Sequence, residues 1–85
     1  MEYVYICFKS RQDANFIADV LQKKGVNCEI VSTPAVFNIG CGLSVKLSKV
    51  YGNFAKRVIS IYNPKSFVAT FLYVTMGKKS TFKRI

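Results

Sequence analysis

The chain has 85 residues, of which 51% are hydrophobic and 20% charged. This length supports one small core and excludes two, and five glycines and two prolines exclude a collagen-like or Gly/Pro-rich chain. Three cysteines cannot all pair within one chain, which argues against a disulfide-rich secreted scaffold. We therefore expect one folded domain in a reducing compartment.

The net charge of +9 lies entirely in the second half of the chain. Residues 1–42 carry four basic and four acidic side chains, whereas residues 43–85 carry nine basic side chains and no acidic one. We expect a domain over residues 1–76 and a basic C-terminal tail over residues 77–85, whose removal should change thermal stability little. The excess of basic residues fits either an anionic partner or a solubilising surface. We favour the solubilising surface, because no other nucleic-acid signature is present.

The first half of the chain predicts a strand, a helix and a second strand. Residues 3–8 are β-branched or aromatic throughout, which is typical of a strand buried on both faces. Ser10 followed by Asp13 resembles a capping box. The helix that follows ends at Gly25, and residues 26–30 alternate as a strand. Its apolar face repeats at helical spacing and consists of Ala14, Ile17, Ala18 and Leu21.

The second half predicts a loop, a strand, a helix and a last strand. Residues 34–42 form the loop, and residues 43–48 alternate between apolar and polar side chains. Residues 53–62 carry a second apolar helical face, and residues 67–75 are a last apolar strand. The order βαββαβ predicts an α+β, ferredoxin-like fold with a four-stranded antiparallel sheet and both helices on one face. In this topology residues 9–11 lie at the same end of the sheet as the loop.

The three cysteines fall into two groups. Cys7 and Cys28 lie mid-strand among apolar residues and are predicted to be buried and structural. Cys41 lies between Gly40 and Gly42 at the mouth of a strand, where glycines permit close approach of a second molecule. The start of the first helix, Lys9 and Arg11 would stabilise a thiolate there. The alternative is a cysteine that only packs in a glycine turn.

The residues that metal, nucleotide and histidine-dependent sites require are absent from the sequence. The chain has no histidine, no CxxC pair, no phosphate-binding loop and no dinucleotide fingerprint. We therefore expect no metal and no cofactor. No basic segment for secretion precedes residues 4–8, and the run at 67–76 is far shorter than the roughly 20 residues of a membrane-spanning helix. We expect a cytoplasmic protein with no membrane association.

A segment of the chain resembles a known family. The stretch from Tyr5 to Ser10, the segment 24–26, and above all Thr33-Pro34 followed by Cys41-Gly42-Leu43 resemble the small bacterial selenium/sulfur carrier-like proteins. The resemblance covers most of residues 3–62 and implies that Cys41 carries sulfur or selenium between a donor and an acceptor protein. Residues 35–39 are more apolar than in that family, which suits a protein partner better than a small ion. The substrate-binding residues that we assign around Cys41 are Lys9, Ser10, Arg11, Thr33, Pro34, Gly40 and Gly42.

The leading hypothesis is thus a carrier that holds a persulfide or selenopersulfide on Cys41 and is not a stand-alone enzyme. Two alternatives involve no chemistry. Tyr3, Tyr5 and Lys46 could belong to a nucleic-acid-binding sheet, although the third strand lacks an aromatic residue for stacking. The same tyrosines could instead cover the open sheet face in a homodimer.

Overall fold

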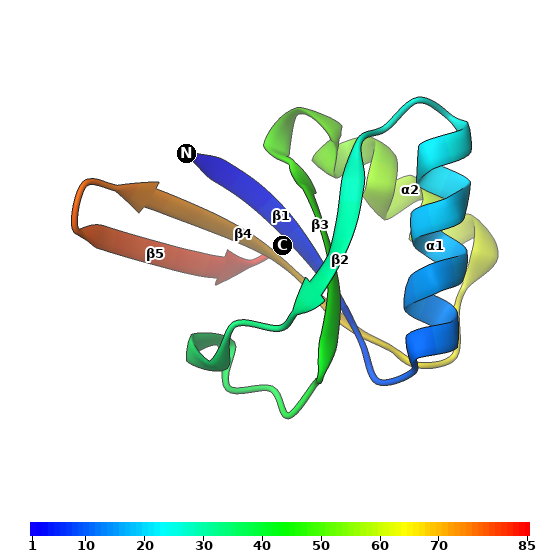
Figure 1. Cartoon of the computed structure of the whole chain (residues 1–85), viewed down its shortest axis with the longest axis horizontal. Helices are drawn as coiled ribbons and strands as arrows, with labels where there is room; N and C mark the ends of the chain where they lie inside the picture. The colour runs from blue at the N-terminus through cyan, green and yellow to red at the C-terminus, as the bar shows by residue number, and fades with distance from the viewer.

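The computed structural model describes all 85 residues as a five-stranded antiparallel sheet with both α-helices on one face (Figure 1). The strand order is β2-β3-β1-β4-β5. The predicted α+β class and the two helices are confirmed, whereas the prediction of four strands is wrong. The elements are β1 (Glu2–Phe8), α1 (Arg11–Lys23), β2 (Cys28–Ser32), the 3₁₀ helix η1 (Ala35–Phe37), β3 (Leu43–Ser48), the 3₁₀ helix η2 (Lys49–Tyr51), α2 (Gly52–Tyr62), β4 (Phe67–Met76) and β5 (Lys79–Arg84).

The additional strand β5 is formed by residues that we expected to be a tail. It pairs with β4, from Met76 opposite Lys79 to Phe71 opposite Arg84. The two-residue turn between them begins at Gly77, whose φ of +59° suits a tight hairpin and is costly for other residues. This hairpin extends away from the helices (Figure 1).

The larger part of the core lies between the sheet and the helices. Because side chains alternate along β1 and β3, every second side chain of these strands faces the helices and packs in this part of the core. Ser10 caps α1 by accepting a hydrogen bond from the Asp13 N–H at 3.3 Å. The predicted capping box is nevertheless incomplete, because the Ser10 N–H donates to the Ser66 hydroxyl and not to Asp13. The buried residues of this part of the core are Val4, Ile6, Phe8, Ala14, Ile17, Ala18, Leu21, Val26, Cys28, Val45, Leu47, Ala55, Val58 and Ile59.

None of the helices is long and apolar enough to cross a membrane.

A second apolar cluster lies on the face of the sheet without helices, and it is built around Phe37 of η1. The loop between β2 and β3 folds onto this face, so that the Phe37 ring stacks on Phe71 with centroids 4.5 Å apart. Phe82 of β5 contacts both of these rings, with its centroid 5.0 Å from that of Phe37 and 5.9 Å from that of Phe71. This contact removes the basis for expecting residues 77–85 to be dispensable. The buried members of the cluster are Tyr5, Cys7, Phe37, Cys41, Ala69 and Phe71.

Candidate functional site

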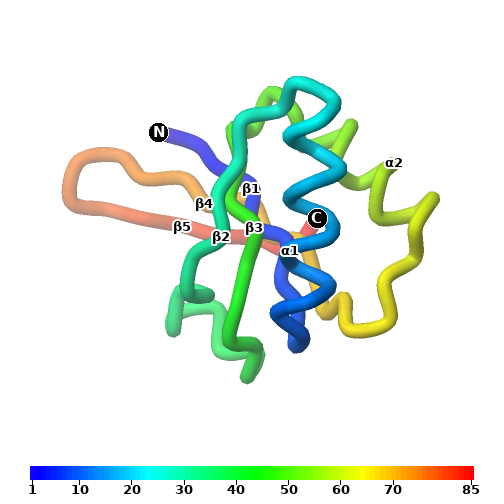
Figure 2. The backbone as a smooth tube through the Cα atoms, turned by 45° about the vertical axis from the view of Figure 1, so that its right-hand side comes forward, coloured from blue at the N-terminus to red at the C-terminus, as the bar shows by residue number.

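The loop of residues 33–42, here called the cysteine loop, brings Cys41 to the end of β1. Its ends are joined by the Thr33 N–H, which donates to the Gly42 carbonyl at 3.2 Å. Gly40 has a φ of +65°, which a residue with a side chain adopts only with strain. Figure 2 shows this loop at the same end of the sheet as the start of α1, as the topology predicts.

The Cys41 thiol is covered by backbone oxygens. Its Sγ donates to the carbonyl of Phe8 at 2.6 Å and lies 3.3 Å from the carbonyl of Leu43. The residue is 9% exposed, so the expectation of a thiol exposed in a surface turn is wrong. Cys41 is therefore sheltered while the loop is closed.

The start of α1 is occupied by other groups. The Ser66 N–H donates to the Asp13 carboxylate at 2.9 Å, and the Ser10 N–H donates to the Ser66 hydroxyl at 3.1 Å. Hydrogen bonding to the Ser66 side chain and to the Ser66 backbone N–H lowers the pKa of Asp13 below its ordinary value. Lys9 and Arg11 are exposed, and neither makes a hydrogen bond or ion pair with Cys41. The residues expected to hold an anion thus lie at the predicted end of the sheet, but they do not contact the sulfur of Cys41.

Two hydroxyl groups connect Cys41 with a second thiol. The Thr33 hydroxyl lies 3.8 Å from the Cys41 Sγ and 2.7 Å from the Ser44 hydroxyl. Ser44 in turn donates to the Sγ of Cys7 at 3.3 Å. Cys7 and Ser44 are paired across β1 and β3 and both point away from the helices. The structure therefore places Thr33 beside Cys41, as assigned, and adds Ser44 and Cys7, which the sequence-based assignment did not include.

The two cysteines predicted to be buried lie on opposite faces of the sheet. Burial raises the pKa of Cys7 from 9.0 to about 11, against a lowering hydrogen bond from Ser44, and the neighbouring Cys41 raises it further. The Cys28 thiol faces α1, where it donates to the Ala18 carbonyl at 3.6 Å, and burial also raises its pKa. Their burial is confirmed. Only Cys7, however, lies beside Cys41.

The remaining assigned residues frame the loop. Pro34 precedes η1 and is half-buried, while Gly40 and Gly42 are exposed. Apart from the adjacent residues of the chain, no atom lies within 4 Å of the position that a Cβ would occupy on either glycine. The flanks of Cys41 thus leave space for an approaching molecule once the sulfur is uncovered.

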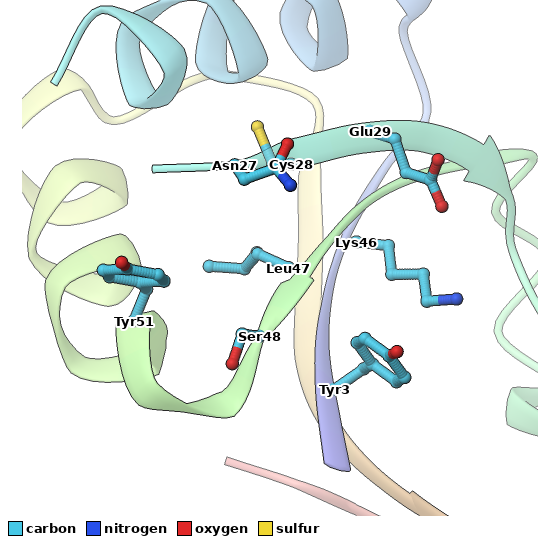
Figure 3. Close-up of a pocket in the computed structure, with 8 residues that line it drawn as sticks. All are labelled: Tyr3, Asn27, Cys28, Glu29, Lys46, Leu47, Ser48 and Tyr51. Carbon is cyan, nitrogen blue, oxygen red and sulfur yellow. The ribbon is translucent and has the colours of Figure 1, made fainter. Parts of the chain in front are cut away.

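A separate polar pocket lies between the starts of β1 and β2 and does not include Cys41 (Figure 3). The Lys46 amino group lies 4.3 Å from the centre of the Tyr3 ring, on the same face of the sheet. The Cys28 sulfur points away from this pair, toward the helices (Figure 3). Tyr5 is buried beneath Phe37 at 5.5 Å and so offers no free ring for base stacking. No group of three or more His, Cys, Asp or Glu side chains is placed to hold a metal ion.

The first three strands, the two α-helices and the cysteine loop lie in a segment that matches a known sequence family. Residues 3–64 match the family described as "Putative Se/S carrier protein-like". The match covers well over half of the chain and includes Cys7, Thr33, Cys41 and Ser44, so the chain belongs to this family, as the resemblance implied. Comparisons with curated proteins and with solved structures found no match.

Proposed function

We propose that the protein is a sulfur or selenium carrier and that Cys41 is the residue that holds the cargo. In the loading step the Cys41 thiolate attacks the outer sulfur of a donor persulfide. The bond between the two donor sulfurs breaks, the donor leaves as a thiol, and Cys41 becomes a persulfide. Passing the sulfur to an acceptor thiol repeats the exchange in the other direction.

The placement of Cys41 carries this proposal. It is the one cysteine of the three that lies outside a strand, in a loop with open space beside both flanking glycines. Family membership supports the same role, because the matched segment contains this loop. The strand order β2-β3-β1-β4 with both helices on one face supports assigning this part of the chain to the ferredoxin-like arrangement.

Loading requires the cysteine loop to open. While the Cys41 thiol donates to the Phe8 carbonyl, its sulfur cannot align with a donor persulfide. Val36 is 54% exposed at the tip of the loop, which offers an apolar contact for a donor or acceptor protein. Lys9 and Arg11 at the same end would attract an anionic cargo once the sulfur is free. Docking at the loop would thus uncover the thiol.

Loading with a limiting amount of glutathione persulfide tests the proposal. Peptide mapping should find a gain of about 32 Da on the peptide that contains Cys41, and a selenopersulfide donor should add about 80 Da to the same peptide. A Cys41→Ser protein should not load, whereas the matched Cys28→Ser protein should load like the wild type. Normal loading of the Cys41→Ser protein would refute the carrier role of Cys41.

A further inference from the structure

Cys7 has no role in the loading step, yet its position is unusual for a merely structural thiol. It lies in the same buried cluster as Cys41, on the sheet face opposite the helices. The Cys41 Sγ is in contact with the carbonyl of Phe8, the residue that follows Cys7 in β1. Two thiols from distant parts of the sequence are therefore brought together under one loop.

Each sulfur of this pair has its own hydroxyl neighbour. Ser44 donates to the Cys7 Sγ at 3.3 Å, and Thr33 lies 3.8 Å from the Cys41 Sγ. The two hydroxyls contact each other at 2.7 Å. Burial raises the pKa of the Cys7 thiol, and the hydrogen bond from Ser44 offsets part of that effect. The two hydroxyls thus form one continuous polar connection between the two sulfurs.

We propose that Cys7 is the resolving thiol for cargo held on Cys41, so that the protein can release its sulfur as hydrogen sulfide. This inference rests on the proposed carrier function. The Cys7 sulfur attacks the inner sulfur of the Cys41 persulfide, which is the Sγ of Cys41. A Cys7–Cys41 disulfide forms, the bond to the outer sulfur breaks, and the outer sulfur leaves with the proton of Cys7 as H₂S.

The electrons balance within the pair. The carried sulfur is reduced to sulfide, while the two cysteine thiols are oxidised to a disulfide. With selenium the same attack releases hydrogen selenide. Restoring the dithiol requires an external dithiol reductant. Closure of the cysteine loop over loaded Cys41 favours this reaction, because it holds the two sulfurs near each other and excludes competing thiols.

Mass analysis of loaded protein in the absence of free thiols tests the inference. Wild-type protein carrying one sulfur should lose about 34 Da as H₂S, release sulfide into solution, and yield a Cys7–Cys41 linked peptide. A Cys7→Ala protein should load and keep its sulfur, while a Cys28→Ala protein should behave as the wild type does. Loaded wild-type protein that keeps its sulfur, or a disulfide that involves Cys28, would overturn the inference while leaving the carrier function intact.

A second measurement needs neither loading nor a variant. Unloaded wild-type protein treated with diamide, a thiol oxidant, should form the Cys7–Cys41 disulfide within one chain. Failure of this pair to link would overturn the inference whatever the loading result. Failure to load sulfur, by contrast, would overturn the carrier function and the release step together.

Discussion

Replacing Phe37 by alanine should uncover Cys41 without touching any residue of the thiol network. The Phe37 ring is only 4% exposed and contacts four aromatic rings with centroids between 4.5 and 5.6 Å away. These rings belong to β1, β4 and β5. Phe37 is therefore the side chain that fastens the cysteine loop to the sheet.

The size of the effect follows from this burial. Truncating a buried phenylalanine to alanine costs about 3–5 kcal/mol. The substitution destabilises the closed loop but not the open loop, because the open loop exposes the Phe37 ring to water in any case. Using the lower value, about 3 kcal/mol, the open population rises roughly 100-fold, since 1.4 kcal/mol is a factor of ten.

Alkylation kinetics measure that population. Under limiting iodoacetamide, the labelling rate of Cys41 should rise roughly 100-fold in the Phe37→Ala protein, as followed by peptide mapping. The matched control is Phe16→Ala. The Phe16 ring is 47% exposed on the helical side, and its partner there is Tyr62 at 5.2 Å. This control should change the labelling of Cys41 less than threefold, whereas an unchanged rate in a folded Phe37→Ala protein would refute the closed-loop account.

Three further predictions concern stability. Deleting residues 78–85 removes β5 and the Phe82 contact with Phe37, so the melting temperature should fall by about 8 °C or more; a shift below 2 °C would contradict this. The pKa of Cys7 is raised in the folded state from 9.0 to about 11. The contribution of this thiol to the free energy of unfolding is therefore fully present below pH 9, and about 2–3 kcal/mol of it is lost as the pH rises to 11. Urea unfolding with reductant should show this loss in the wild type and a smaller one in Cys7→Ala. Ser10→Ala removes the cap of α1 and should cost about 1 kcal/mol in the same assay, without altering Cys41 labelling.

The sequence is sufficient to predict the α+β class, four of the five strands and both α-helices. The helices, β2 and β3 show periodic apolar positions, whereas β1 and β4 are recognised as continuous apolar runs. The alternation in residues 43–48 and the helical spacing from Ala14 to Leu21 arise from burial of one face. The position of Cys41 at the end of β1 follows from topology alone. A closer comparison of the two strands would also have paired Cys7 with Ser44, since both stand on the side opposite the helix-facing residues.

The closure of the cysteine loop could not be predicted in this way. Phe37 lies in a segment without periodicity, and its burial depends on Phe71 and Phe82, which are more than 30 residues away in the sequence. Strand β5 could not be predicted either, because its polar side chains resemble those of a solvated tail. The signal for it is the short turn at Gly77, which is weak without knowledge of the strand that it joins.

The most direct test of the central claim is the intact mass of the protein isolated without reductant, followed by mapping of its three cysteines. The account predicts a fraction of molecules with about 32 or 80 Da added at Cys41, and a further fraction with a Cys7–Cys41 disulfide. Removal of both by a dithiol reductant should return the reduced mass. Sulfur or selenium bound at Cys28 alone, with Cys41 reduced and unmodified in every molecule, would contradict the account.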